Sequence, residues 1–281
     1  MMLERTTDER WLANAYLVAD QPGGQGFLID LNERLDPLLE AADRDQVTIT
    51  HILVTHEHDD HVVDLERVRE RLGATVVAHH LAESALPVVD RLVDDRERLE
   101  IADMSVEVIH LGGHSAGQVA FVVGHKDCFT ADALFRGTLG GQREPGPAAF
   151  EEVRVSVMER LLALDGDTNL HPGHASPTTV AHELEHNPFV RVWRGLDPMG
   201  VEPCRVASAF GWEATLVLKA ADYDGGTKAW VRFPRAGDAI IGGSQVHPAD
   251  DGQRRSRAVT RAETAWYSGG GRIRNLEAPN S

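Results

Sequence analysis

The stretch Thr55-His-Glu-His-Asp-Asp-His61 concentrates metal-binding side chains at one point of the chain. It follows a β-branched, apolar segment typical of a buried strand and opens a segment with helical spacing. Residues two apart in an extended segment face the same side, so His56 and His58 can meet one ion. Asp60 and His61 then project to a neighbouring point as the chain turns. The spacing predicts a cradle for two metal ions rather than a solvated loop that is merely rich in histidine.

Three further candidates follow at later strand ends. His114 lies in Leu111-Gly-Gly-His-Ser-Ala-Gly117, where the glycines let the backbone approach a metal closely. Asp132 ends a strand-like run, and His174 ends the run His171-Pro-Gly-His174. Alone, an isolated histidine is more often structural and a strand-end aspartate more often caps a turn. Because all three residues follow the first stretch in this order, each one strengthens the assignment of the others as metal ligands.

The segments that must position these residues alternate between strand-like and helix-like patterns. This βαβ rhythm implies an α/β layered domain. Breaks containing glycine or proline separate the segments. We expect strands over residues 11–18, 26–31, 47–55, 74–78, 105–110, 118–123 and 127–131, and helices over residues 35–43, 61–72, 151–164 and 178–186.

Beyond residue 195 the pattern changes to short strands, expected over residues 205–210, 214–220, 227–233 and 239–241. We therefore divide the chain into a catalytic domain (1–194), a small β-rich appendage of unknown role (195–250) and a flexible tail (251–281). The appendage should supply no metal ligand, because the earlier residues already offer enough. Its aromatic residues, among them Tyr223 and Trp230, either pack a small β core or form an interface over the active-site mouth, with the core or with a second subunit.

Composition narrows the function. The formal net charge of -16 over 281 residues disfavours nucleic acid and an anionic membrane surface as partners, since both need clustered Lys and Arg. No apolar run approaches bilayer length, and the charged N-terminus lacks the pattern of a signal peptide. The two cysteines, Cys128 and Cys204, indicate neither a disulfide framework nor a zinc ribbon. We expect a cytoplasmic protein with a small-molecule substrate, and leave open whether it forms a homo-oligomer.

The motifs together resemble the metallo-β-lactamase superfamily, and within it the glyoxalase II-like (hydroxyacylglutathione hydrolase-like) hydrolases. The resemblance covers about residues 10 to 190 and implies an αββα sandwich with metals at one edge of its two sheets. The matched motifs are Thr-His-Glu-His-Asp-Asp-His at 55–61, Gly-His-Ser-Ala-Gly at 113–117, Phe-Thr-Ala-Asp-Ala-Leu-Phe-Arg-Gly at 129–137 and Pro-Gly-His-Ala-Ser-Pro-Thr-Thr at 172–179.

Carried over motif by motif, the resemblance implies two metal sites and a bridge. The first site would use His56, His58 and His114, and the second Asp60, His61 and His174, with Asp132 between them. Two departures stand beside these ligands: the family usually has glycine where this chain has Ala131 and Ala175. They leave the ligands intact and bear on the shape of the substrate pocket.

The expected reaction is metal-dependent hydrolysis. Two divalent ions on shared ligands lower the pKa of a bridging water, and the hydroxide attacks a carbonyl carbon while a metal stabilises the oxyanion. Asp132 would fix the spacing of the ions and Asp60 would orient the nucleophile. A ligand set of histidine and aspartate suits zinc, iron or manganese, and we expect zinc. The resemblance points to a thioester of a small thiol as substrate, with a lactone as a close variant.

Two other readings stay open. Persulfide dioxygenases are similar in fold and motifs and use a single iron, which here would be held by His56, His114 and Asp132. A non-enzymatic module with structural metals is disfavoured, because structural sites are usually compact and rich in cysteine.

Overall fold

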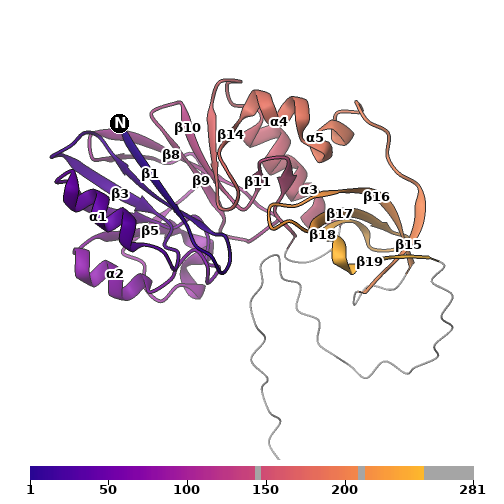
Figure 1. Cartoon of the computed structure of the whole chain (residues 1–281), viewed down its shortest axis with the longest axis horizontal. Coiled ribbons are helices and arrows are strands. Elements are labelled where there is room, and N and C mark those ends of the chain that lie inside the picture. The colour runs from indigo at the N-terminus through magenta and orange to yellow at the C-terminus, as the bar shows by residue number, and fades with distance from the viewer. Residues whose placement is uncertain (143–146, 208–212, 250–281) are drawn as a thin grey trace, which may run out of the picture.

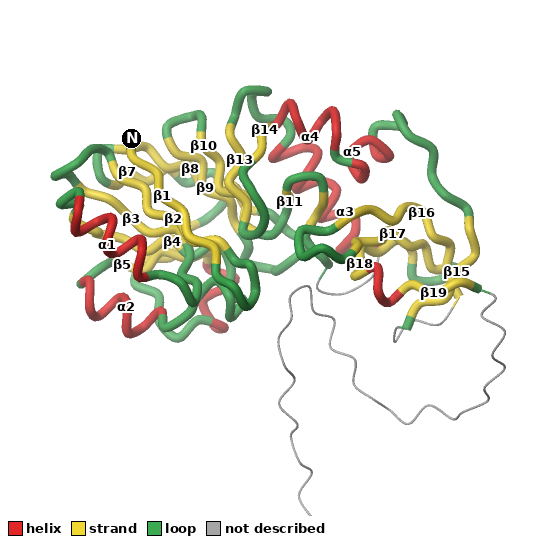
Figure 2. The backbone as a smooth tube through the Cα atoms, in the orientation of Figure 1, coloured by secondary structure: helices red, strands yellow, loops and turns green. Residues whose placement is uncertain are grey.

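A computed structural model describes residues 1–142, 147–207 and 213–249. The expected tail at 251–281 and the end of the expected strand at 205–210 lie outside the described residues. The fold contains two six-stranded sheets and, towards the C-terminus, a five-stranded sheet (Figures 1 and 2). None of the described helices is long and apolar enough to cross a membrane.

The first sheet is built from the N-terminal strands in sequence order. Strands β1 to β3 pair antiparallel, and β3 to β6 pair parallel. Parallel pairing requires crossovers, which run through helices α1 (Asp36–Arg44) and α2 (Leu65–Leu72). The strands are β1 (Met2–Thr7), β2 (Asn14–Ala19), β3 (Gln25–Ile29), β4 (Thr48–Leu53), β5 (Thr75–His79) and β6 (Arg91–Val93).

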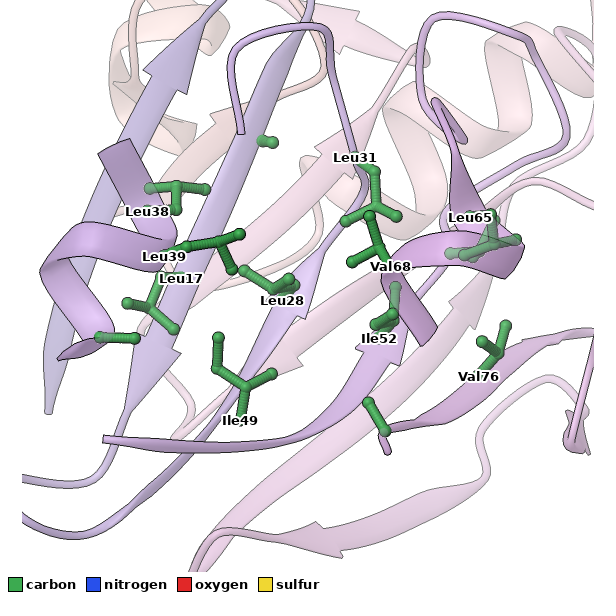
Figure 3. Close-up of a cluster of buried hydrophobic side chains, with 14 of the residues drawn as sticks. Leu17, Leu28, Leu31, Leu38, Leu39, Ile49, Ile52, Leu65, Val68 and Val76 are labelled. Atoms are coloured by element: carbon green, nitrogen blue, oxygen red, sulfur yellow. The ribbon is translucent and has the colours of Figure 1, made fainter. Parts of the chain in front are cut away.

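Helices α1 and α2 cover the outer face of this sheet. Leu38 and Val68 point from the helices toward Leu28 and Ile52 of the strands, and all four lie in one buried cluster (Figure 3). These positions follow from helical spacing of leucine and valine, which places the apolar side chains on one face. Burial of this face fixes the helices, and with them the loops at the sheet edge.

The second sheet has the order β14-β13-β10-β9-β8-β7. Its inner face meets the first sheet through buried aromatic residues that include Phe27, Phe121 and Phe129. Its outer face carries α3 (Pro147–Val155), a π-helical turn (Ser156–Leu161), α4 (Val180–His186) and α5 (Pro188–Trp193). The predicted αββα sandwich is therefore confirmed. The strands are β7 (Arg98–Ile101), β8 (Met104–His110), β9 (Val119–Val123), β10 (Asp127–Ala131), β13 (Asn169–Pro172) and β14 (Thr178–Thr179).

The remaining strands lie after residue 133. Leu134–Phe135 (β11) and Thr138–Leu139 (β12) form a small hairpin. The C-terminal sheet has the antiparallel order β18-β17-β16-β15-β19 and lies at the opposite end of the molecule from α1 and α2 (Figure 1). Its strands are β15 (Glu202–Val206), β16 (Glu213–Ala221), β17 (Thr227–Phe233), β18 (Gly237–Gly242) and β19 (Val246–Pro248).

One face of the C-terminal sheet packs on the sandwich. Val217, Trp230 and Ile240 share a buried cluster with residues of α3 and α5. The Trp230 ring lies 5.1 Å from that of Phe150 and 6.0 Å from that of Trp193. Trp230 therefore packs at the interface with the sandwich, which is one of the two arrangements expected for the aromatic residues of this segment. A separate cluster that includes Val231 and Ile241 forms the sheet's own core.

Several predicted element bounds are wrong. The helix expected over residues 61–72 begins only at Leu65, because Asp64 adopts a left-handed conformation (φ 53°) that cannot start a helix. The helix expected over 151–164 begins at Pro147 and ends in the π-helical turn. The strand expected over 11–18 begins at Asn14, and the charged segment Met2–Thr7 forms an edge strand that was not predicted.

Candidate metal centre

The seven predicted ligands come together at one edge of the sandwich. His56, His58, Asp60 and His61 occupy the turn between β4 and α2. His114 lies in the loop between β8 and β9. Asp132 follows β10 and His174 follows β13, and because these two strands are parallel neighbours their carboxyl ends meet at the same edge.

The first group consists of His56, His58 and His114. The His58 Nδ1 atom lies 3.1 Å from His56 Nε2 and 3.0 Å from His114 Nε2. One ligand atom from each residue lies within 4.8 Å of the others. Three imidazole nitrogens directed at one point form a half-site suited to a transition metal.

The second group consists of Asp60, His61 and His174. The Asp60 Oδ2 atom lies 3.7 Å from His61 Nε2 and 3.4 Å from His174 Nε2. These ligand atoms also lie within 4.8 Å of one another. The group mixes nitrogen and carboxylate donors, which differs from the all-histidine set beside it.

Asp132 lies between the two groups. Its Oδ2 atom is 3.6 Å from His114 Nε2 and 3.3 Å from His174 Nε2, while Oδ1 is 3.5 Å from His61 Nε2. One carboxylate therefore approaches nitrogens of both groups at once. This is the position that a bridging ligand requires.

The outward nitrogens of three imidazoles are held by hydrogen bonds. His114 Nδ1 lies 2.8 Å from the Gly141 carbonyl oxygen, and His174 Nδ1 lies 3.1 Å from that of Leu12. A carbonyl only accepts, so each Nδ1 donates its proton, and Nε2 is the ring atom that faces the cluster. His61 Nδ1 makes the equivalent contact, 3.0 Å, with Asp30 Oδ2.

Asp30 is a functional residue that the sequence analysis missed. Besides His61, it accepts hydrogen bonds from the Thr55 backbone N–H (2.8 Å) and hydroxyl (2.7 Å). It therefore fixes both the His61 ring and the start of the ligand turn. The available signal was a carboxylate at the end of the strand expected over residues 26–31, at the same sheet edge as the ligands.

Burial and charge divide the histidines into two kinds. Burial lowers the pKa of His56 well below its usual value and that of His114 to about 3. Burial also acts to lower the pKa of His61 and His174, but the carboxylates of Asp60 and Asp132 raise it to about 9 and about 10 respectively. The neutral pair is ready to bind metal, whereas the other two hold protons that a cation would displace.

The buried polar atoms at the centre fit metal ions. Among the described residues, His61 Nε2, His174 Nε2 and Asp132 Oδ1 are buried without a hydrogen-bond partner. Such atoms are rare in folded proteins because leaving them unpartnered is costly. Cations between the two groups would satisfy all three, and donors that are only nitrogen and oxygen suit zinc, iron or manganese.

Glycines bring the backbone close to Asp132. A Cβ atom at Gly173 would lie 2.2 Å from Asp132 Oδ1, and one at Gly140 would lie 1.6 Å from the Asp132 carbonyl oxygen. Ala131 (φ 48°) and Ala175 (φ 70°) occupy left-handed conformations that favour glycine. The two alanines that depart from the family pattern therefore adopt the backbone conformation that glycine would adopt at these positions.

The loop that carries His174 is fastened to β2. The Tyr16 hydroxyl donates to the Pro172 carbonyl oxygen at 2.6 Å, and the Asn14 amide donates to the carbonyl oxygens of Pro172 and Ala175 at 2.9 and 2.8 Å. These bonds join the two sheets beside the ligands. They restrict the movement of the His174 backbone.

Two neighbouring candidates lie apart from the cluster. His171 Nε2 contacts Asp127 Oδ1 at 2.8 Å, and its ring stacks on Phe129, so the structure brings His174 and not His171 to the ligands. The Cys128 thiol is fully buried in β10, and burial raises its pKa. A buried thiol with a raised pKa is a poor nucleophile, in agreement with the expectation that Cys128 has no catalytic role.

The C-terminal sheet reaches the cluster through Tyr223, in the hairpin between β16 and β17. Its ring stacks on His174 with 4.5 Å between ring centroids and packs edge-on against Phe135 at 5.1 Å. Sequence reasoning placed Tyr223 among the interface candidates and did not identify its contact with a ligand.

A model of the metallo-beta-lactamase superfamily matches residues 8–177. This chain belongs to that superfamily. A hydroxyacylglutathione hydrolase of Rhizobium meliloti is 35% identical to it over 168 residues, which span 59% of this chain and 63% of the relative. The chain is thus similar to relatives of the glyoxalase II group, as the motifs predicted.

Solved structures share the fold. TTHA1623 in a di-iron-bound form matches with a TM-score of 0.56 and 33% identity, over 66% of this chain and 99% of that one. ETHE1 from Myxococcus xanthus matches with a TM-score of 0.61 and 25% identity, over 70% of this chain and 92% of that one. Both likenesses leave about a third of this chain unmatched.

Proposed function

We propose that this protein is a two-metal hydrolase that cleaves a small-molecule thioester. The observation that carries the proposal is the position of Asp132, whose carboxylate lies between two separate groups of three ligands. His56, His58 and His114 would hold one divalent ion and Asp60, His61 and His174 the other, with Asp132 shared. The di-iron form of TTHA1623 supports the count of two.

Bound ions would supply hydroxide at neutral pH and stabilise negative charge on the substrate carbonyl oxygen. The chain's own residues position the reactants. The Asp60 side chain is partly exposed, and its pKa is lowered because His61 and His174 outweigh the effect of burial. It is therefore ionised at neutral pH and accepts a hydrogen bond from the attacking water.

The proposed reaction balances with water as the only co-reactant. The water oxygen forms a bond to the carbonyl carbon, the carbon–sulfur bond breaks, and the thiol leaves with a proton from the water. The resemblance to hydroxyacylglutathione hydrolases favours a thioester over a lactone as the substrate.

The experiment is a panel of thioester, lactone and persulfide substrates, assayed with zinc-, iron- and manganese-loaded protein. We expect thioester turnover that is lost on chelation and restored by metal, and lost in Asp132→Ala, which removes the shared ligand and adds repulsion between two cations. Oxidation of a persulfide by a protein with a single iron would replace this proposal with the dioxygenase alternative.

A further inference from the structure

A cavity of about 620 Å³ lies between the sandwich and the C-terminal sheet. Residues 10–12 and 141–142 form one wall. The hairpin between β16 and β17 and the turn at residues 242–245 form the other. We call this cavity the hairpin pocket. Its volume falls in the range of roughly 300–1,000 Å³ typical of small-molecule sites, and its second wall lies beyond the residues that the superfamily model matches.

Three residues that line the hairpin pocket contact histidines of the proposed metal centre. The Leu12 carbonyl contacts His174, the Gly141 carbonyl contacts His114, and the Tyr223 ring stacks on His174. The pocket thus borders ligands of both proposed metal sites. A molecule in it would lie beside the place where the reaction occurs.

The outer wall is fixed to the sandwich. Gln142 and Ile240 exchange two hydrogen bonds: the Ile240 N–H donates to Gln142 Oε1 at 2.5 Å, and the Gln142 N–H donates to the Ile240 carbonyl at 3.3 Å. Lys228 and Asp222 form a buried ion pair of 3.0 Å at the base of the hairpin. The wall is therefore preorganised, which reduces the entropy lost when a ligand binds.

The charge of the hairpin pocket differs from that of the molecule. Arg10, Lys219 and Lys228 line it, against Asp222 and Asp224. Asp222 pairs with Lys228, and Arg10 pairs with Glu33 at 2.5 Å. The Lys219 ammonium donates to the Gly243 carbonyl at 2.9 Å and forms no ion pair with a carboxylate in the described ranges. In a chain of net charge -16, Lys219 is an exposed lysine at the cavity without a carboxylate partner, and such a cation favours an anionic ligand.

We propose that the hairpin pocket binds the non-reacting part of the substrate and that Lys219 recognises a carboxylate or phosphate on it. This inference rests on the proposed function, because it places the scissile carbonyl at the metal centre next to Tyr223. The sandwich supplies the chemistry and the C-terminal sheet supplies the specificity. The substrate class is then a thioester that carries an anionic group at a distance from the reacting bond.

The first test compares acetyl thioesters of three thiols: neutral 2-mercaptoethanol, 3-mercaptopropionate and 2-mercaptoethyl phosphate. Wild-type protein should prefer the carboxylate or the phosphate, and the larger preference identifies the anion. Lys219→Gln should lower the anionic-to-neutral ratio of kcat/KM about tenfold, chiefly through KM, as expected for loss of one charge-assisted contact. The matched control is Lys126→Gln, an exposed lysine at the opposite end of β10 from Asp132, which should leave the ratio unchanged. An unchanged ratio in Lys219→Gln would overturn the proposal.

A binding measurement separates this inference from the proposed function. The probe is the uncleavable thioether ketone formed from 3-mercaptopropionate and a 2-oxopropyl group, titrated calorimetrically into metal-loaded protein. Weaker binding to Lys219→Gln than to Lys126→Gln supports the pocket even if no thioester is hydrolysed, which would refute only the function. Thioester hydrolysis with equal binding to both variants refutes only the pocket.

Discussion

Histidine side chains at the candidate metal centre are held in place by hydrogen bonds to their outward ring nitrogens. Each of His61, His114 and His174 presents one ring nitrogen to the cluster because its other nitrogen is bonded to Asp30 or to a backbone carbonyl. Partners of this kind set the ring orientation and tautomer of metal-binding histidines. The site therefore depends on backbone positions that no ligand motif identifies.

The two histidines of the run His171-Pro-Gly-His174 should respond differently to substitution. His174→Ala should abolish turnover and reduce bound metal, because it removes a member of the second group. His171→Ala should keep most of the activity and lower stability by about 1–3 kcal/mol, since it removes a buried hydrogen bond and ring packing. Metal content, kcat/KM and denaturant unfolding measure these effects. The reverse order of effects on turnover would refute the ligand assignment.

Gly173 provides a steric test of the position of Asp132. Gly173→Ala should lower kcat/KM by about 100-fold or more, because the new Cβ would lie 2.2 Å from Asp132 Oδ1 and displace the shared carboxylate. The control is Gly166→Ala, where the nearest atom to a new Cβ is 3.7 Å away. If the two variants have equal activity, Asp132 does not need its observed position.

Metal uptake should release protons. The pKa values of about 9 for His61 and about 10 for His174 mean that both rings are protonated near pH 7.5 in the metal-free protein. Their pKa is raised above the ordinary value of 6.5, so the stability that these protons contribute is present below pH 6.5 and lost as pH rises through 9 to 10. Metal binding at pH 7.5 should release about two protons per chain, measured with an indicator dye in weak buffer. His174→Ala should release few or no protons, because it impairs the group that holds both of them, and no release from the wild type would contradict the protonated state of His61 and His174.

At the scale of elements, the hairpin between β16 and β17 matters because it reaches the ligands. Tyr223 is the contact, since its ring stacks on His174 and packs edge-on against Phe135 of β11. The C-terminal sheet thus contacts the candidate metal centre through a residue that is not one of the seven candidate ligands.

Stacking by Tyr223 should stabilise the second metal. Tyr223→Ala should weaken it about tenfold, because the His174 ring loses its neighbour, while Tyr223→Phe should retain the affinity. Competition with a chelator, followed in two steps, measures both affinities. If Tyr223→Phe and Tyr223→Ala weaken metal binding equally, the hydroxyl rather than the ring is responsible.

The sequence predicted elements best where side-chain periodicity and burial agree. The strands near residues 118–123 and 127–131 were located closely because β9 is apolar throughout and β10 has the buried apolar residues Cys128 and Phe129 at its centre. The start of α2 was misplaced because the turn that holds the ligands continues to Asp64, whose left-handed backbone no periodicity reveals. The edge strand Met2–Thr7 was missed because only its pairing with β2, not its charged composition, makes it a strand.

The clustering of the seven candidate ligands was predictable from the sequence, and their surroundings were not. Motif order identified seven residues that the fold brings together, because spacing in a family motif encodes their place at the strand ends. Asp30, the Leu12 carbonyl and Tyr223 contact those ligands from segments distant in sequence. Such contacts depend on tertiary packing, which local patterns do not encode.

At the scale of the whole molecule, we propose that the sandwich carries out the chemistry and that the sheet packed on it provides the selectivity. The buried interface around Trp230 joins the two, so the hairpin pocket is a fixed feature of the fold. The chain carries a large net negative charge, which would repel an anionic substrate. We expect Lys219 at the hairpin pocket and the metal ions at the centre to provide the local positive charge that attracts it.

The most direct test of the central claim is the metal content of purified protein, measured by elemental analysis for the wild type and for His174→Ala and His56→Ala. The account predicts two ions per chain in the wild type and about one in each variant, because each substitution impairs one group of ligands. A wild type that holds a single ion, retained in His174→Ala and lost in His56→Ala, would contradict the two-metal centre.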